Sequence, residues 1–211
     1  MGNNGAATMN WDGYEIYDPG AFGPLHALPR TEARRAFNQL MDAKPGRIQM
    51  LHWLLNANGA ELAGTGAGIQ DLNDWFVANV QADPGKPGRL LPAWYSVVND
   101  AALFLGEVMI QRCPGLRWEF YTWGKKNAFC QRHVIMGFTQ VLSPKYGIDI
   151  DAMVAAYAHC IVASRGSVPH YGLITIRGVE IDLDAVTARM RPAKVERDAF
   201  LRWVKLAESR A

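Results

Sequence analysis

The sequence has few cysteines and no long apolar run. Its three cysteines are an odd number, which is typical of free thiols in a reducing compartment rather than of a disulfide framework. No apolar run approaches the ~20 residues that a membrane-spanning helix needs. The first residues, 1–13, have neither the basic region nor the apolar region of a secretory signal. We therefore expect a cytoplasmic protein with no membrane partner.

Runs of one charge are also missing. The chain has 22 basic and 20 acidic residues, and no basic block is longer than Lys125-Lys126. Such a block is too short for the basic footprint of a nucleic-acid-binding protein, so we expect no nucleic-acid partner. The apolar fraction of 49% and the charged fraction of 20% are those of an ordinary globular chain.

Motifs for common catalytic and cofactor chemistry are absent. No serine lies in a GxSxG motif, the strained elbow that exposes the nucleophile of many hydrolases. The stretch Gly64–Gly68 is rich in glycine, but it follows a predicted helix and no Lys-Ser/Thr closes it. It therefore lacks the context of a phosphate-binding loop, and we expect no cofactor.

The strongest positive signal is the stretch Trp94–Arg112. Its apolar residues recur at steps of three and four, and Leu103, Phe104 and Ile110 fill much of the opposite side. A helix that is apolar nearly all round belongs in the middle of a core. Pro114 follows the stretch and is expected to stop the helix.

Helices are also predicted before this stretch. Pro45 suits the first turn of a helix, so residues 31–43 and 46–58 are expected to form an antiparallel pair of helices. A third helix is expected over Ile69–Val80. The Pro- and Gly-rich loop Ala82–Pro92 then leads to the central helix, and it is a candidate binding loop.

The C-terminal half begins with apolar and polar residues that alternate with a period of two. The alternation in Leu116–Trp123 and the apolar run Ala128–Phe138 predict a β-hairpin. The segments expected after it are a helix from Asp149 or Asp151, a second hairpin over 171–181, and a final helix with Pro192 in its first turn.

This order of segments predicts an α+β fold. N-terminal helices and a central buried helix are expected to pack on a small antiparallel sheet of hairpins, followed by a C-terminal helix. Residues 31–211 are predicted to form a single α+β domain. Residues 1–30 are predicted to form an irregular N-terminal arm, whose aromatic side chains lie over that domain.

A candidate binding surface combines aromatic and basic residues near the first predicted hairpin. Tyr121 and Trp123 fall on the strand face opposite Leu116 and Trp118. Both faces of the strand can belong to the core only if other parts of the chain cover each of them. Aromatic residues with arginine are typical of interface hot spots, whereas a sheet with one polar face is the simpler alternative. The residues of this predicted surface are Tyr95, Tyr121, Trp123, Lys125, Lys126 and Arg132.

Acidic residues of the central helix form a second candidate site. Asp100 and Glu107 lie two turns apart on one face, where apolar neighbours would raise the pKa of an unpaired carboxyl group. Glu107 with His133 could then serve a small hydrolase or a metal-dependent enzyme. We favour the alternative that Glu107 forms a structural ion pair that joins the helix to the sheet. The candidate partners are Arg112, Arg117 and Arg132.

A metal site would have to use Cys130, His133, His159 and Cys160, because thiolate and imidazole are ligands that zinc prefers. The spacing argues against this site. Residues three apart on a strand face opposite sides, and adjacent residues on a helix do not converge. A Cys/His nucleophile pair also lacks any local protease or amidase signature. We therefore expect no metal.

The segment Leu90–Phe138 carries a family resemblance. Ala102, Phe104, Leu105, Gly106 and Glu107 on the predicted helix are followed by a short basic stop, and then by Leu116 and Trp118 in a strand and by a second strand. This pattern resembles that of small bacterial α+β proteins similar to the immunity proteins of polymorphic toxin systems. The resemblance implies a protein that binds a toxin, with no catalytic residues to assign.

The hairpin residues and the resemblance lead to the same functional hypothesis. We predict a non-catalytic protein-binding module of the immunity type, which binds and neutralises a protein partner such as a toxin. The enzyme that uses Glu107 and His133 is the alternative. Self-association into a homo-oligomer is left open.

Overall fold

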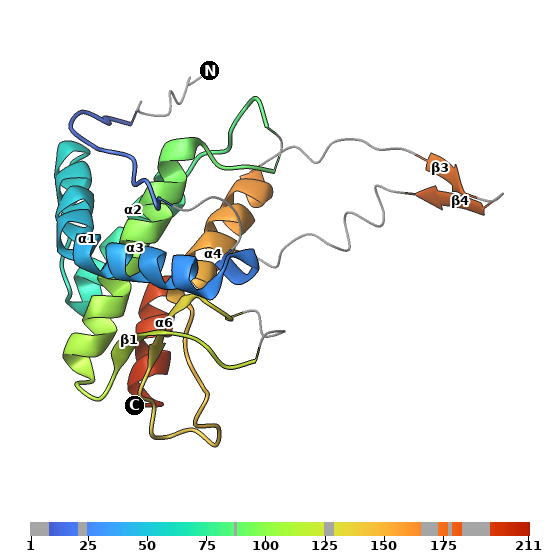
Figure 1. Cartoon of the computed structure of the whole chain (residues 1–211). Coiled ribbons are helices and arrows are strands. Elements are labelled where there is room, and N and C mark those ends of the chain that lie inside the picture. The colour runs from blue at the N-terminus through green and yellow to red at the C-terminus, as the bar shows by residue number, and fades with distance from the viewer. Residues whose placement is uncertain are drawn as a thin grey trace.

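The helix predicted at the centre of the chain is also the centre of the structure. The computed structural model describes residues 9–20, 25–86, 88–124, 129–165, 173–176, 179–182 and 195–211. The central helix α3 spans Pro92–Arg112 and is buried on nearly every side. It packs against α1, α4 and α6 and runs through the middle of the molecule (Figure 1). The prediction of a buried central helix is therefore confirmed.

Four further α-helices belong to the described part of the chain. They are α1 (Arg30–Ala57), α2 (Gly66–Asn79), α4 (Ile150–Arg165) and α6 (Ala199–Glu208), and a short 3₁₀ helix, η1 (Leu25–Ala27), precedes α1. The helices pack around α3 and on a small antiparallel sheet, so the fold is α+β, as predicted. None of the described helices is long and apolar enough to cross a membrane.

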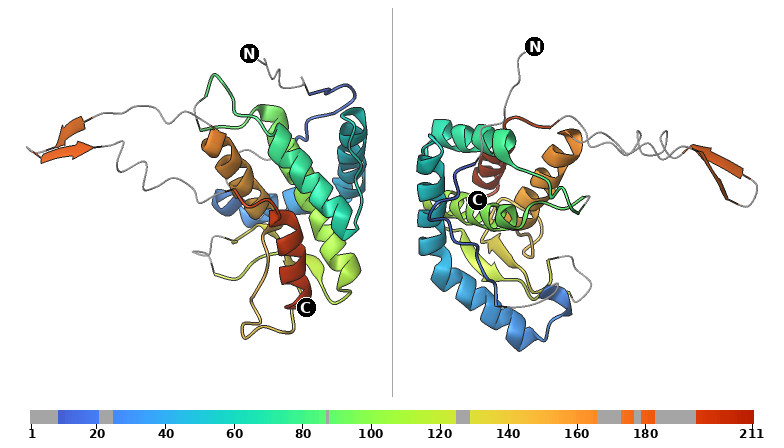
Figure 2. Two further views of the ribbon diagram at one scale, coloured as in Figure 1. Left: turned by 180° about the vertical axis from the view of Figure 1, so that it is seen from behind. Right: turned by 90° about the horizontal axis from the view of Figure 1, so that it is seen from above.

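A single helix replaces the antiparallel pair that was predicted for residues 31–58. The helix α1 continues through Pro45 for 28 residues, so the prediction of a break was wrong. Proline removes one backbone hydrogen bond and bends a helix, and α1 is bent along its length in Figures 1 and 2. Leu40, Arg47 and Leu51 are all buried and share one face of the helix. This buried face continues across the exposed Pro45, and it holds both halves of α1 on the core.

The predicted first hairpin is present, with shorter strands. Strands β1 (Arg117–Phe120) and β2 (His133–Met136) pair antiparallel, with Phe120 opposite His133. The ring of Phe37 on α1 lies 5.7 Å from the ring of Phe120, so α1 packs directly on this sheet.

A second hairpin and the last helix complete the described chain. Strands β3 (Leu173–Ile176) and β4 (Val179–Asp182) pair antiparallel, as predicted. The last helix starts at Ala199, later than expected, and Pro192 lies outside the described residues. In its first turn the backbone N–H of Phe200 donates a 3.3 Å hydrogen bond to Oδ1 of Asn73 in α2. A partner distant in sequence thus caps α6, and local patterns do not reveal it.

The joint between α3 and the sheet explains the Gly-Glu pair that precedes the Trp strand. A Cβ atom on Gly106 would lie 2.1 Å from Cζ2 of Trp118, so only glycine leaves room for the indole ring. The adjacent Glu107 accepts a 2.8 Å hydrogen bond from Nε1 of Trp118. The motif on which the family resemblance was based is therefore a packing contact between helix and strand.

Candidate functional site

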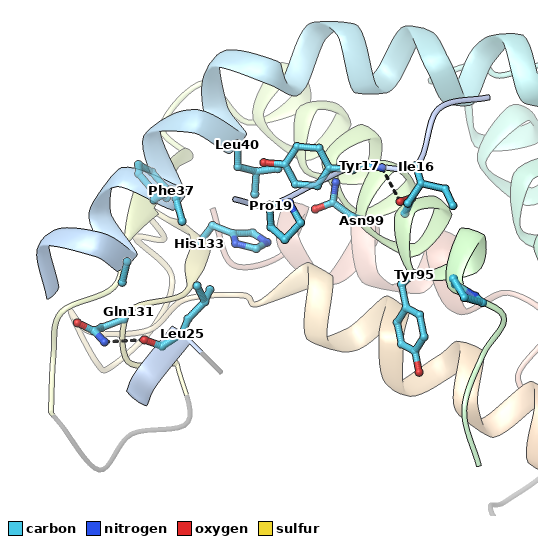
Figure 3. Close-up of a pocket in the computed structure, with 14 residues that line it drawn as sticks. Ile16, Tyr17, Pro19, Leu25, Phe37, Leu40, Tyr95, Asn99, Gln131 and His133 are labelled. Atoms are coloured by element: carbon cyan, nitrogen blue, oxygen red, sulfur yellow. Dashed lines mark hydrogen bonds between the residues drawn. The ribbon is translucent and has the colours of Figure 1, made fainter. Parts of the chain in front are cut away.

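A cavity of about 250 Å³ lies where the N-terminal arm, α1, α3 and β2 meet (Figure 3). Its wall is mainly apolar and contains a small number of polar side chains, which is the usual character of a small-molecule site. The lining residues are Ile16, Tyr17, Pro19, Leu25, Ala33, Ala36, Phe37, Leu40, Pro92, Tyr95, Ser96, Asn99, Gln131 and His133.

Two helices contribute faces with identical spacing. Ala33, Ala36, Phe37 and Leu40 of α1 lie at positions i, i+3, i+4 and i+7, which is one side of a helix. In α3 the residues with the same spacing are Pro92, Tyr95, Ser96 and Asn99. The α1 face includes two alanines, whose small side chains leave room between the helices. The α3 face is polar at Ser96 and Asn99, although most of α3 is apolar, and this polar interruption was a signal that sequence reasoning missed.

The arm forms one side of the cavity and is bound to α3 and α1 by hydrogen bonds. The backbone N–H of Tyr17 donates to Oγ of Ser96 at 2.7 Å. Arg47 of α1 donates to the carbonyl oxygen of Glu15 at 2.7 Å. At the start of the arm the ring of Trp11 packs edge-on against Trp94, with ring centroids 5.7 Å apart. The prediction that arm aromatics lie over the body is therefore confirmed for the described residues 9–20.

A buried ionic cluster lies behind the arm. Arg47 donates to both carboxylate oxygens of Asp100, at 2.8 and 2.6 Å, and the hydroxyl of Tyr14 donates to Asp100 at 2.6 Å. Burial raises the pKa of Asp100, while the hydrogen bonds from Arg47 and Tyr14 act in the opposite direction and stabilise the carboxylate. Burial and the nearby Asp100 raise the pKa of Tyr14, so its hydroxyl remains protonated and donates. The cluster joins arm, α1 and α3 through one charged centre.

The hydroxyl of Tyr17 is the polar group of the cavity wall whose bonding is incomplete. It is buried and has no hydrogen-bond partner among the described residues. Burial raises the pKa of Tyr17, so the group remains a neutral donor. In Figure 3 its ring lies across the cavity, near Leu40 and above His133. Its oxygen is enclosed by the side chains packed around it, so it does not face the open space of the cavity.

The loop before β2 closes another side of the cavity. The side chain of Gln131 donates to the carbonyl oxygens of Leu25, at 2.6 Å, and Leu28, at 3.0 Å. Gln131 also has a positive φ of 64°, a conformation that is uncommon for residues other than glycine. Figure 3 shows its bond to Leu25 at the edge of the cavity. These bonds attach the 3₁₀ segment and the hairpin to each other.

His133 occupies the cavity wall as a neutral imidazole. It is buried, and this burial lowers its pKa, while Asp151 and Asp149 raise it and Arg132 lowers it. Its Nε2 is 3.9 Å from Oδ2 of Asp151, which is too far for a hydrogen bond. His133 was named in the sequence as a partner of Glu107 and as a metal ligand, and the structure places it in this cavity instead.

The lowered pKa of His133 predicts a specific dependence of stability on pH. Below its ordinary pKa of about 6.5 the unfolded chain binds a proton at this residue more readily than the folded protein does. The stability contributed by neutral His133 is therefore present above about pH 6.5 and is lost as the pH falls, by at most about 1.4 kcal/mol per pH unit. We expect the free energy of unfolding in urea to fall more between pH 7.5 and pH 5.5 for the wild type than for His133→Gln. Parallel pH curves for the two proteins would contradict this assignment.

Glu107 lies in an ion pair outside this cavity wall. Its Oε1 is 2.5 Å from Nζ of Lys44 and also accepts the bond from Trp118. The expected ion pair is therefore present, but its partner is a lysine of α1 and not one of the three arginines. Glu107 does not line the cavity that His133 lines. Glu107 and His133 therefore do not open into one cavity, which the alternative catalytic pair would require.

The residues of the predicted binding surface have different environments. Trp123 is 49% exposed and Tyr95 is 40% exposed, and Lys125 and Lys126 lie outside the described residues. Tyr121 is buried against Val134 and Met136, contrary to the expectation that it is exposed, whereas Arg117 on the same strand face is exposed.

Arg132, a residue of the predicted surface, is paired with acidic residues at the start of α4. It forms ion pairs with Asp149 and with Asp151, the latter at 2.7 Å. Asp149 also accepts a 2.9 Å hydrogen bond from the backbone N–H of Ala152, which confirms it as a cap of this helix. Arg132 therefore joins the hairpin to α4.

The four residues considered for zinc do not form a metal site. Among the described residues, no group of three or more His, Cys, Asp or Glu side chains could hold a metal ion. Cys130 and Cys160 are free thiols, as is Cys113. The ring of His159 lies 6.2 Å from that of Tyr95, at the contact of α4 with α3. His133 faces the cavity, so the four side chains serve separate parts of the fold.

Comparison with known proteins gives no relative from which to transfer a function. No protein-family model, curated protein or solved structure matches this chain.

Proposed function

We propose that this protein is a non-catalytic binding protein that holds a small molecule in the cavity between the arm, α1, α3 and β2. The observation that carries the proposal is a mainly apolar cavity whose wall also holds the neutral polar side chains of Asn99 and His133. Sites for small molecules have this composition: apolar walls and a small number of polar groups that orient the ligand.

The arrangement favours binding over catalysis. Among the described residues that line the cavity, His133 is the one whose ordinary pKa is near neutral. A hydrolase would need this imidazole beside a nucleophile or a second acid–base group. Ser96 is held by the backbone N–H of Tyr17, and Glu107 is held by Lys44 and Trp118. The groups that could assist His133 are thus occupied by structural bonds.

The test is to fill the cavity by substitution. Ala36→Phe places a large side chain in the cavity wall, whereas Asn38→Phe adds the same side chain at an exposed position of α1. We expect ligand-observed NMR with a fragment library to find molecules that bind the wild type and Asn38→Phe with similar affinity, and Ala36→Phe at least tenfold more weakly. A library that yields no such fragments, or fragments that bind all three proteins alike, would exclude the cavity as the site.

A protein partner is the second candidate function. The observation that favours it is Trp123, which is 49% exposed beside the hairpin and has Nζ of Lys145 5.1 Å from its ring centroid. An exposed tryptophan with a cation is typical of an interface hot spot, and it suits a partner with an acidic surface. The immunity-type role, in which this partner is a toxin, rests on the resemblance of Leu90–Phe138. This candidate requires that Trp123→Ala weakens capture of one defined partner, and that Ala36→Phe leaves capture unchanged.

A further inference from the structure

We propose that the cleft between the loop Ala82–Pro92 and the C-terminal end of α4 binds a small organic acid, with its carboxylate on the guanidinium of Arg165 and its apolar part in the cleft. This site goes beyond the proposed function, because it shares no lining residue with the cavity that contains His133. Three observations lead to it: a fixed loop, an apolar cleft, and an edge of an arginine that has no partner among the described residues.

The loop that forms one wall of the cleft is closed on itself by backbone pairing. Ala82 and Leu90 form an isolated antiparallel bridge, and the backbone N–H of Leu91 donates to the carbonyl oxygen of Gln81 at 3.2 Å. The backbone N–H of Leu90 also donates to the hydroxyl of Tyr95 on α3, at 3.3 Å. These contacts fix the loop on the body, so its side of the cleft is in place before a ligand binds.

An open cleft of about 540 Å³ lies between this loop, the end of α2 and the last turn of α4. In Figures 1 and 2 the loop (green) reaches the C-terminal end of α4 (orange). The volume is within the ~300–1,000 Å³ of small-molecule sites. Except for Gln81 and Arg165, the described residues that line the cleft are aliphatic, among them Ala82, Leu91 and Val162. Such a wall suits a compact apolar group that stays partly in contact with water.

The guanidinium of Arg165 is held at this wall by one of its three nitrogens. Its Nη1 donates to the carbonyl oxygen of Val80 at 2.6 Å, and the residue as a whole is exposed, so a ligand can approach it from water. Its Nε and Nη2 form no hydrogen bond with any of the described residues. These two nitrogens form an edge of the planar group that binds a carboxylate through two parallel hydrogen bonds.

The same edge is occupied by a carboxylate in two other arginines of this protein. Nε and Nη2 of Arg47 donate to the two oxygens of Asp100, at 2.8 and 2.6 Å. Nε and Nη2 of Arg132 donate to the two oxygens of Asp149. Arg165 has no such carboxylate among the described residues, so a ligand can supply it.

The acidic residues of the described chain leave Arg165 available. None of them lines the cleft, and Asp83 of the loop accepts a 2.9 Å hydrogen bond from the backbone N–H of Gly85. Partial burial lowers the pKa of Arg165 and no neighbouring carboxylate raises it, yet a guanidinium stays charged near neutral pH. The cleft therefore attracts an anion, and its aliphatic wall favours an acid with an apolar part.

The experiment compares three small molecules. Hexanoate has a carboxylate and an apolar chain, hexan-1-ol has the chain without the charge, and acetate has the charge without the chain. Binding of each to the full chain is measured at pH 7.5 by NMR titration of isotope-labelled protein, including the assigned Nε–H signal of Arg165. Arg165→Gln removes the charge, and Arg35→Gln is its control at an exposed arginine of α1. Ala82→Phe fills the cleft, and Asn38→Phe is its control on α1.

We expect hexanoate to bind the wild type at least about fivefold more tightly than hexan-1-ol or acetate does. Arg165→Gln is expected to weaken hexanoate about five- to tenfold and to leave hexan-1-ol unchanged, because it removes charge-assisted hydrogen bonds and keeps the apolar wall. Ala82→Phe is expected to weaken both molecules. Both control variants are expected to bind like the wild type.

Acetate that binds as tightly as hexanoate would overturn the role of the apolar wall. Hexanoate that binds Arg165→Gln as tightly as the wild type would overturn the role of the guanidinium, and hexanoate that does not bind the wild type would overturn the site. If Arg165→Gln does not fold, the Nε–H signal of Arg165 in the wild type decides, because it must shift with hexanoate. Ala36→Phe is expected to leave hexanoate unchanged, and a loss of binding in this variant would place hexanoate in the cavity instead of the cleft.

Discussion

Replacing Arg47 with methionine is expected to destabilise the protein by about 3–5 kcal/mol, because it leaves Asp100 charged and unpaired in the core. Asp100 is 0% exposed, and Arg47 donates to both of its carboxylate oxygens. The long apolar stem of methionine preserves most of the packing, so the loss reports the broken ion pair. The measurement is the free energy of unfolding in urea at pH 7.5.

The control is the double variant Arg47→Met/Asp100→Asn. Removing both charges of a buried pair is often nearly neutral, and asparagine retains an oxygen that accepts from Tyr14. We therefore expect the double variant to recover most of the stability that Arg47→Met loses. If Arg47→Met alone costs less than about 1 kcal/mol, the pair is more exposed to water than the structure indicates.

The substitution Gly137→Ala has the second large expected effect, a loss of about 2–6 kcal/mol. Gly137 follows β2 with a φ of 107°, a conformation that side chains rarely adopt. A Cβ atom there would also lie 2.1 Å from the carbonyl oxygen of Gly115, which belongs to the backbone and has little freedom to move. The strained backbone conformation and the steric contact with Gly115 each cost about 1–3 kcal/mol.

Gly59→Ala separates these two penalties. Gly59 also has a positive φ, 74°, but a Cβ atom there would meet nothing within 4 Å. We expect Gly59→Ala to cost about 1–2 kcal/mol from the backbone alone. Unfolding by urea and circular dichroism of both variants compares them directly. Equal losses would show that the hairpin moves away from Gly115 without cost.

Parts of the fold were predictable because they depend on local patterns. Trp94–Arg112 is apolar nearly all round, and only a buried position satisfies such a helix. The alternation after Leu116 led to the β1–β2 pair, and Asp149, one of the two residues expected to start the next helix, caps α4. In each case the residues that determine the element are neighbours in the chain.

The errors came from contacts between distant residues. Pro45 predicts a break by local rules, yet the buried face from Leu40 to Leu51 maintains one bent helix. Glu107 was expected to pair with a nearby arginine, but Lys44, 63 residues away along the chain, is its partner. The first turn of α6 is capped by Asn73, which is separated from Phe200 by 127 residues. Spacing along the sequence contains no information about such pairs.

The sequence predicted individual residues of the candidate site but not the site itself. Tyr95 and His133 were selected from the sequence, for a protein interface and for an acid–base pair, and both line the cavity. The polar positions Ser96 and Asn99 on an apolar helix were a usable signal. Tyr17 had no such signal, because its place in the wall depends on the arm crossing α3 at Ser96, to which its backbone N–H donates.

The sequence alone determined the α+β class, the buried central helix and the hairpin, since side-chain periodicity decides which face of an element avoids water. Only the tertiary structure decided which charges pair, where the last helix begins and that a cavity exists. The cavity is the space left where the arm, α1, α3 and β2 fail to fill the volume between them. Its walls come from residues as far apart as Ile16 and His133, and only the packed fold brings them together.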